Sequence, residues 1–583
     1  MSESKPSSSK MDRRALLTTT GALAATTVLV STPAHGEEDS GPSHGVAAGT
    51  PALRRPRRQV PQAGTEPTPN LGVIVFNRLA LGPRPGDVAS FDGLGNTPLE
   101  RLTAWVDQQI DWQSIPDPVA DAALSAANFT TLNKTRQQLW VEHIVANMDT
   151  SLPREEVIRA TCLRGVYSER QLLEVMADFW HNHFNVYADR SVVRTLIANY
   201  DRSVIRPHVF GNFRQMLEDV AMSTSMLYYL DNYTSTNAGP NENFCRELLE
   251  LMTLGAENYL GILPQSEVPT DGEGLPIGYV DADVFEAVRC FTGWSVDNTT
   301  NNGGSNDGSF LYKSVDHDRF QKNVLGVFIP QDQPPLKDGR DVLDALAAHP
   351  GTGRHIAGKL CRRLISDHPP QTVIDQAAAL FTAQKDAPDQ LAQVVRLIVL
   401  SNEFQSTWGG KTKRPFEIGI GALRAAQADF DFSIGDSDTD SMLSRLRATG
   451  HSIFRRASPD GFPDFKEAWE STTPRALSWK WVNWLIDVRD DDDNFRFGCP
   501  WGDAAECSHF DGVSRLLDRS HSSAPDDAGG PTGHHRVHGS RFQPRYRSAP
   551  RHQFYHPRPP PFDGRSHLYD TQFSIPIMSI ERE

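Results

Sequence analysis

The feature that most constrains the fold of this chain is the helical spacing of its apolar residues. In segment 168–180, large apolar side chains recur every three to four residues, which places them on one face of a helix. Only segments 72–79 and 322–330 are good strand candidates. The sequence therefore predicts a mostly α protein, a single large helical domain over 70–487 with long loops and at most a few short strands. The other helical segments are 99–110, 211–230, 281–294, 353–365, 390–404 and 416–430, and the long loops are near 260–280 and 296–312.

The N-terminus has the pattern of an export signal. Two arginines, Arg13 and Arg14, precede an uncharged run that ends at the small-x-small site Thr32-Pro33-Ala34. Residues 1–34 are therefore predicted to be a signal peptide, and the arginine pair favours the twin-arginine type. Residues 35–69 are rich in Pro, Gly and Arg, which predicts a disordered linker. We expect an exported protein, periplasmic, cell-surface or secreted, with no stable membrane span after signal removal.

The last part of the chain, residues 488–583, differs in composition from the helical domain. It holds 8 of the 19 histidines and has few aliphatic runs. A His-rich metal-binding tail is one interpretation. The sequence favours the other, an out-of-frame translation of a GC-rich gene. Either origin predicts a disordered segment.

Charge and cysteine usage exclude some classes of protein. The net charge of -15 argues against general nucleic-acid affinity. The six cysteines contain no CxxC motif, which excludes a zinc ribbon or a thioredoxin-like motif. Cysteines 162, 245, 290 and 361 lie in apolar helical contexts, so we expect buried free thiols there.

Many sequence blocks follow one another in an order that resembles a known family. The blocks are "FNRLALGPRPGDVASF", "VYSERQLLEVMADFWHNHFNV", "YDRSVIRPHVFGNFRQML", "MLYYLDN", "NENFCRELLELMTLG", "AVRCFTGW", "HDRFQKNVLG", "HPGTGRHIAGKLCRRL", "LSNEFQS", "KRPFE" and "PDGFPDFKEAW". Over roughly residues 70–487 the chain resembles the bacterial family of unknown function called DUF1800. The resemblance implies a fold class and little mechanism. It also implies that a histidine usually stands where this chain has Met252, so a family site that uses that histidine would be weakened here.

The first candidate cluster is His181-Asn182-His183 in "DFWHNHFNV". On an unbroken helix alternate residues point about 200° apart, so the two imidazoles cannot bind one metal ion. They could do so only if the helix ended near Trp180 and the chain became extended. The alternative is that His183 is a hydrogen-bonded core histidine and His181 a capping or surface group.

The second candidate cluster lies in "NENFCRELLELMTLG". Glu247 and Glu250, three residues apart, could face one site as carboxylate ligands do in helical bundles. The alternative is an intrahelical ladder in which Glu242, Arg246 and Glu250 form ion pairs at i, i+4.

The third candidate cluster is in "DHDRFQK". His317 and Asp318 follow a Gly/Asn-rich loop and could complete a site with imidazole and oxygen donors. The alternative is a polar loop that enters a strand. No GxSxG, P-loop, GxGxxG or HExxH motif supports a more familiar chemistry.

These clusters lead to competing functional hypotheses. The first is a metal-assisted, hydrolase-like enzyme that acts on an envelope or extracellular substrate with a divalent metal ion. His183, Glu247 and Glu250 would be catalytic, and the metal ligands would come from His181, His183, Glu247, Glu250, His317 and Asp318. The second is a non-catalytic secreted binding or assembly protein whose His and Glu clusters are structural. A haem protein with His183 as axial ligand is a third, which no CxxCH motif supports.

Overall fold

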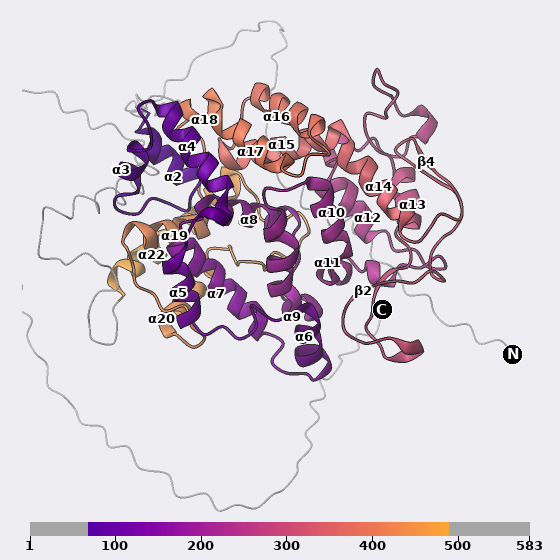
Figure 1. Ribbon diagram of the computed structural model, residues 1–583, viewed down its shortest axis with the longest axis horizontal. Coiled ribbons are helices and arrows are strands. Elements are labelled where there is room, and N and C mark those ends of the chain that lie inside the picture. Colours follow the sequence, from indigo (N-terminus) through magenta and orange to yellow (C-terminus); the bar gives the residue numbers. More distant parts are fainter. Residues whose placement is uncertain (1–67, 489–583) are drawn as a thin grey trace, which may run out of the picture. The chain divides into compact units, whose positions relative to one another are not determined.

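The computed structural model describes residues 68–488 (Figure 1). Helices dominate this part of the chain, and its strands form two small two-stranded antiparallel sheets. The prediction of a mostly α fold is therefore confirmed. The predicted signal peptide, nearly all of the linker and nearly all of the tail lie outside the described residues, together with Cys499 and Cys507.

The helices and strands are as follows. The N-terminal helices are α2 (Leu71–Arg78), α3 (Asp87–Asp92), α4 (Pro98–Ile110), α5 (Pro118–Ala126), α6 (Arg136–Leu139) and α7 (Leu152–Tyr167). The central helices are α8 (Gln171–His183), α9 (Ser191–Tyr200), α10 (Phe213–Met222), α11 (Thr224–Tyr229), α12 (Asn243–Glu247) and α13 (Asp281–Cys290). The later helices are α14 (Lys337–Ala348), α15 (Pro350–Leu364), α16 (Gln371–Ala383), α17 (Gln390–Leu400), α18 (Asn402–Ser406), α19 (Pro415–Ala425), α20 (Ser437–Ala448), α21 (Lys466–Trp469) and α22 (Thr472–Asp487).

Shorter elements complete the fold. The strands are β1 (Trp294–Val296), β2 (Phe310–Tyr312), β3 (Lys322–Val324) and β4 (Val327–Ile329), paired β1 with β2 and β3 with β4. Three single turns are π-helical: η3 (Trp140–Val145), η4 (Asp201–Ile205) and η7 (Leu248–Met252). The 3-10 turns are η2 (Trp112–Ser114), η5 (Arg206–His208), η6 (Asn232–Thr234), η8 (Ala256–Asn258), η9 (Gln265–Glu267) and η10 (Asn301–Gly303).

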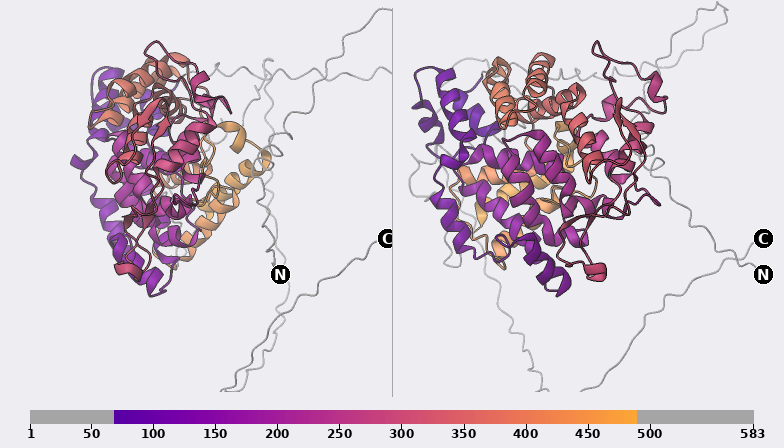
Figure 2. Two further views of the ribbon diagram at one scale, coloured as in Figure 1. Left: turned by 90° about the vertical axis from the view of Figure 1, so that its right-hand side faces the viewer. Right: turned by 45° about the vertical axis from the view of Figure 1, so that its right-hand side comes forward.

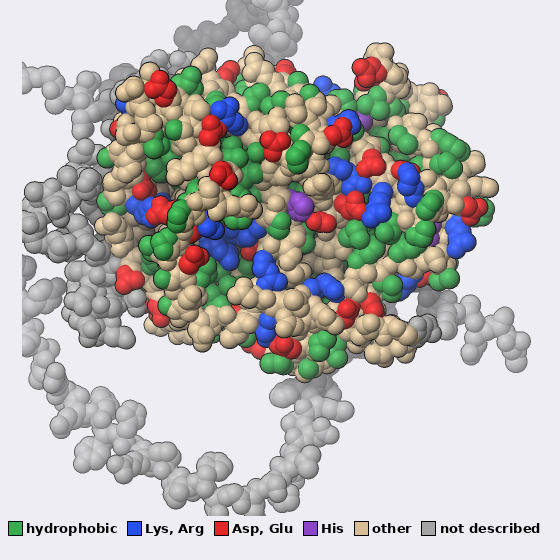
Figure 3. Space-filling view, viewed as in Figure 1, with side chains coloured by type: hydrophobic (Ala, Val, Ile, Leu, Met, Phe, Trp, Pro, Cys, Tyr) green, Lys and Arg blue, Asp and Glu red, His purple; other side chains and the backbone are tan. Residues whose placement is uncertain are grey.

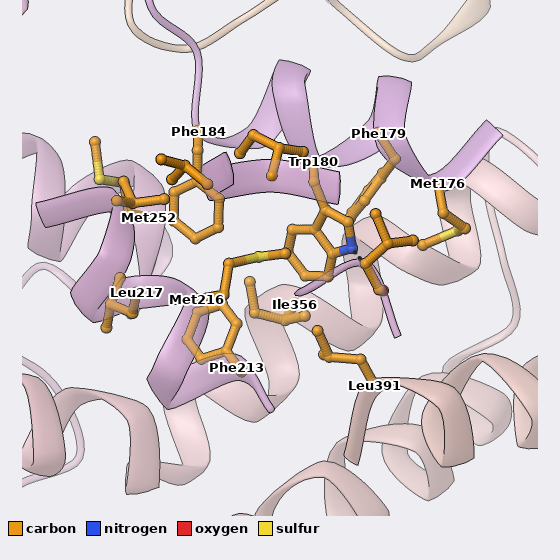
Figure 4. Close-up of a cluster of buried hydrophobic side chains, with 14 of the residues drawn as sticks. Met176, Phe179, Trp180, Phe184, Phe213, Met216, Leu217, Met252, Ile356 and Leu391 are labelled. Atoms are coloured by element: carbon orange, nitrogen blue, oxygen red, sulfur yellow. Dashed lines mark hydrogen bonds between the residues drawn. The ribbon is translucent and has the colours of Figure 1, made fainter. Parts of the chain in front are cut away.

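Helix α8 runs through the largest hydrophobic core. Its residues Met176, Phe179 and Trp180 point into a cluster that also receives Met216 from α10 and Ile356 from α15 (Figure 4). All five side chains are buried, and the indole nitrogen of Trp180 is not left unpaired, because it donates to the carbonyl of residue 209 at 3.2 Å. The apolar face predicted from the helical spacing is thus the face that α8 buries.

A second core cluster lies between α7 and the C-terminal helices α19, α20 and α22. In Figure 1 these helices lie behind α7 and α8, and in Figure 2 they stand on one side of the central helices. The four cysteines predicted to be buried free thiols, 162, 245, 290 and 361, are buried and unpaired, which confirms that prediction.

One of the two strand candidates is wrong. Segment 72–79 belongs to helix α2, which begins where the side chain of Asn70 accepts a hydrogen bond from the Gly72 N–H at 2.7 Å. Ile74 and Val75 are fully buried in this helix. A short, almost wholly apolar run fits a buried helix as well as a buried strand, so spacing alone cannot separate them.

The other strand candidate, 322–330, is extended as predicted, but it forms two short strands, the β3–β4 hairpin, and not one strand. Its turn residues Leu325 and Gly326 both have positive φ, as a two-residue hairpin turn requires. Among residues 68–488, no helix combines the length and apolar character needed to cross a bilayer.

Candidate functional site

Helix α8 continues unbroken through His183, so its two terminal histidines point in different directions. His181 is buried and donates from Nε2 to a carboxylate oxygen of Asp201, the first residue of η4, at 2.9 Å. It is therefore neither a surface nor a capping group, which corrects that alternative. Arg206 contacts Asp201 at 2.9 Å and Glu174 of α8 at 2.7 Å. These charges form a buried network that cross-links α8 to η4 and η5.

The electrostatics of this network favour its charged form. Burial alone would raise the pKa of Asp201, but Arg206 and His181 hold it far below its usual range. The same pairing raises the pKa of the Arg206 guanidinium, against the opposite effect of burial. The carboxylate and the guanidinium therefore stay ionised inside the protein.

His183 has a different environment from His181. Its side chain is buried against aromatic rings, and its Nε2 donates to the carbonyl of Met252, the last residue of η7, at 3.2 Å. Its Nδ1 is buried without a hydrogen-bond partner among the described residues. Burial, with help from Lys359 and His355, lowers the pKa of His183 well below 6.5. The imidazole is therefore neutral, and Nδ1 carries a free lone pair.

The two asparagines of the stretch hold a distant loop. Asn182 Nδ2 donates to the Phe462 carbonyl at 2.7 Å, and its Oδ1 accepts from the Phe462 N–H at 2.6 Å. Asn185 donates to the carbonyls of residues 456 and 458. Gly461 approaches Asn182 so closely that a Cβ there would lie 2.2 Å from the Asn182 carbonyl oxygen. Residues 456–462, here called the strap, are thus bound to the end of α8.

Glu247 and Glu250 lie on either side of a change in helix geometry. The helix changes to a π turn at Leu248, so the two glutamates no longer have α-helical i, i+3 spacing. Glu247 acts electrostatically on Tyr229, whereas Glu250 acts on Tyr279. The predicted intrahelical ladder of ion pairs is present in part, because Arg246 pairs with Glu242 at 3.5 Å.

The third cluster forms its own contacts near β3. His317 Nε2 contacts Asp338 at 3.1 Å, and Asp338 also accepts from Lys322 at 2.7 Å. Asp318 pairs with Arg289 at 2.9 Å. Lys322 is fully buried, and its ammonium donates to two backbone carbonyls as well. These residues tie the hairpin to α13 and α14.

The six residues considered as metal ligands are therefore not gathered at one place. Over residues 68–488, no group of three or more His, Cys, Asp and Glu side chains is arranged to hold a metal ion. Each candidate histidine has a protein partner within hydrogen-bond distance.

A group of basic residues on α15 lies beside His183, and the sequence reasoning missed it. His355 lies 6.2 Å from His183 between ring centroids, and it contacts Glu257 at 2.8 Å and the Leu251 carbonyl at 3.2 Å. Lys359 follows His355 at i+4, so both project from one face of the helix. The opposite face packs against α16. The segment "GRHIAGKLCRRL" contains the pattern that could have revealed this group, because its basic residues recur at helical spacing opposite an apolar stripe.

Lys359 has no hydrogen bond or ion pair with any residue of the described chain, although it is only partly exposed. Burial lowers its pKa to about 8, assisted by Arg362 and opposed by Asp464, Glu257 and Asp460. These three carboxylates have other bases as partners. Asp464 pairs with Lys411 at 2.8 Å, Asp460 with Arg456 at 3.2 Å, and Glu257 with His355.

The fold and this site define a mostly α-helical protein in which a partly exposed cationic position on α15 lies near the strap, the π turn η7 and the end of α8. Residues 74–545 match the family model described as "Protein of unknown function (DUF1800)". The chain belongs to the DUF1800 family. No curated protein and no solved structure matches the chain.

Proposed function

We propose that this protein is an exported binding protein that holds an anionic group of an extracellular or envelope ligand at Lys359. The observation that carries the proposal is the partly exposed ammonium of Lys359, which lies near His183 and has no ion pair or hydrogen bond within the described structure. Partial burial lowers the pKa of Lys359, and a partner of opposite charge would compensate this cost. A ligand carboxylate, sulfate or phosphate would supply that compensation.

Neighbouring groups support the same chemistry. Arg362, one turn after Lys359 on α15, also has no ion pair within the described residues, so a second cation is available. The π turn η7 lies beside the same position, because its Leu251 and Met252 carbonyls accept from His355 and His183, and such turns are frequent at functional sites. The polar side chains of α8 cross-link helices, as a binding protein with structural His and Glu clusters would require.

Calorimetric titration of the exported protein with inorganic phosphate, sulfate and succinate tests this function. Wild type should bind at least one of them saturably, and Lys359→Met should lose at least about tenfold in affinity. That loss is about 1.4 kcal/mol. Because the pKa of Lys359 is about 8, anion affinity should also fall as the pH rises from 7 to 9.

Lys385→Met is the matched control, since Lys385 is an exposed lysine that pairs with the neighbouring Asp386. It should bind anions as wild type does, and circular dichroism should show that both variants are folded. Equal binding by the Lys359 and Lys385 variants, or no saturable binding by wild type, would contradict the proposal.

A metal-assisted, hydrolase-like enzyme is the second candidate, and one observation favours it. The free lone pair on the buried Nδ1 of His183 could serve as a general base or as one metal ligand. Elemental analysis of the exported protein tests this. One bound divalent metal ion per chain, lost in His183→Ala, would support the enzyme, and a metal-free wild type would count against it.

A further inference from the structure

Exposed apolar side chains concentrate in one segment of the described chain. Nine of its eighteen exposed large hydrophobic residues lie between residues 262 and 328, a segment that holds less than a fifth of residues 68–488. Ile262 is 83% exposed, Phe328 is 62% exposed and Phe285 is 54% exposed. Figure 3 shows hydrophobic side chains gathered on the right of the molecule, in the region of α13, β2 and β4. Patches of this kind mark interaction surfaces.

A hollow of about 430 Å³ lies within this segment. It is lined by residues of the 265–276 loop, of α13 and of the β3–β4 hairpin, and the lining is largely polar: Gln265, Ser266, Val268, Pro276, Asp283, Asn323 and Gly326. Gln265 Nε2 donates to Asp283 at 2.7 Å and to the Asn323 carbonyl at 2.9 Å, which fixes the loop to both elements. Hydrogen bonds therefore fix the walls of the hollow, and the hollow could receive a side chain of another molecule.

The hairpin beside the hollow has one occupied edge and one open edge. Val324 pairs with Val327 across the two-residue turn, so the next pair, Asn323 and Phe328, turns its backbone groups outward. On β3, Glu286 accepts a hydrogen bond from the outward Asn323 N–H at 3.1 Å, and the side-chain amide of Gln265 donates to the Asn323 carbonyl. On β4, the described residues provide no hydrogen bond to the N–H or C=O of Phe328. An unpaired strand edge is a template for another extended chain.

The charge of the segment indicates what could bind there. Residues 262–328 contain ten acidic residues and four Lys or Arg. Glu267, Asp271 and Glu273 of this stretch are exposed. A basic partner would be attracted to this surface, whereas an anionic membrane would be repelled. The net charge of -15 also disfavours a second copy of the chain.

We propose that the 262–286 segment and the β3–β4 hairpin dock a basic, extended segment of a partner protein. The partner strand would pair with the Phe328 backbone on the open edge of β4, a mode in which main-chain hydrogen bonds give affinity and side-chain pockets give specificity. One polar or basic side chain of the partner would enter the largely polar hollow, and its other basic side chains would face Glu267, Asp271 and Glu273. This surface is independent of Lys359.

Binding of labelled peptides to the full-length exported protein tests the proposal. The probe is a nine-residue peptide that alternates lysine with valine and phenylalanine, and its comparison peptide replaces each lysine with glutamate. Fluorescence anisotropy should show at least tenfold tighter binding of the lysine peptide, with the affinity falling as salt rises from 20 to 300 mM.

Three variants distinguish docking at this edge from nonspecific apolar binding. Phe328→Pro removes the outward N–H and should weaken lysine-peptide binding at least tenfold. Leu99→Ser changes a residue of α4 that is 51% exposed, and it should leave the binding unchanged. Phe285→Ser should weaken binding without touching the hairpin backbone. Equal binding of the two peptides, or equal binding by the Phe328, Phe285 and Leu99 variants, would overturn the proposal. A dimer in sedimentation that Phe328→Pro dissociates would also overturn it, in favour of a second copy.

Discussion

At the scale of single residues, the polar side chains of α8 join distant parts of the chain. His181, Asp201 and Glu174 are buried, and the half-buried Arg206 pairs with both carboxylates. A second buried group joins Arg414 to Asp178 and Glu417, and Arg363 to Glu417. A buried ion pair does not by itself make a protein more stable than an apolar pair would. Removing one partner is costly, however, because it leaves the other charge buried and uncompensated.

Arg206→Met should therefore destabilise the protein strongly. The substitution leaves the Asp201 and Glu174 carboxylates buried without their shared cation, and the expected loss is about 3–5 kcal/mol of unfolding free energy. Urea denaturation measures it. Arg354→Met, which replaces an exposed arginine on α15, is the control and should change the free energy by less than about 0.5 kcal/mol. A similar loss in both variants would refute the role assigned to Arg206.

Acid should destabilise the protein through its neutral buried histidines. Burial lowers the pKa of both His183 and His451 well below 6.5, so below that pH the unfolded chain binds protons that the folded chain does not. Stability should fall as the pH drops from 7 to 5, by up to about 1.4 kcal/mol per pH unit for each histidine. Below about pH 4, carboxylates with lowered pKa such as Glu417 add to the loss.

The pH dependence can be assigned by substitution. In His451→Gln, the slope of unfolding free energy against pH between 7 and 5 should be shallower than in wild type. His368→Gln, at an exposed histidine, should keep the wild-type slope. An unchanged slope in the His451 variant would show that this residue is not the cause.

At the scale of elements, α8 shows both what spacing predicts and what it misses. Its apolar stripe of Leu172, Met176, Phe179 and His183 is buried, as helical spacing predicts. The polar residues Glu174 and His181 are buried as well, because η4 and η5 supply charged partners that no local pattern reveals. A polar stripe on a helix can therefore face either solvent or a buried network of charged partners.

Asn182→Ala should loosen the strap without unfolding the helices. The substitution removes both hydrogen bonds to Phe462, so the amides of residues 456–462 should exchange hydrogen at least about tenfold faster, a change of about 1.4 kcal/mol in the local opening free energy. Hydrogen–deuterium exchange mass spectrometry measures this. Asn199→Ala, which removes only a contact to the exposed Ser203, should leave the strap unchanged. Uniformly faster exchange throughout the protein would mean that Asn182 has a global role.

At the scale of the whole molecule, the functional proposal requires export. Replacement of Arg13 and Arg14 by lysine should retain the precursor inside the cell if the twin-arginine route is used. Immunoblotting of cell fractions should show the shorter mature protein only for wild type. Its N-terminal sequence should begin just after Ala34. Undiminished export of the lysine variant would exclude this route, and an uncleaved N-terminus would exclude the signal peptide.

The sequence by itself determined the helical class, the positions of helices such as α4, α8, α10 and α15, the extended character of 322–330 and the free buried cysteines. These follow from local spacing, turn chemistry and residue type, which act over a few neighbouring residues. The sequence also showed that His181 and His183 cannot chelate one ion from an unbroken helix. Only the tertiary structure decided that the helix continues through His183, that Asn182 binds a loop 280 residues away, and that Lys359 lies unpaired near His183. The physical reason is that a side chain's partner depends on which distant segments pack against it.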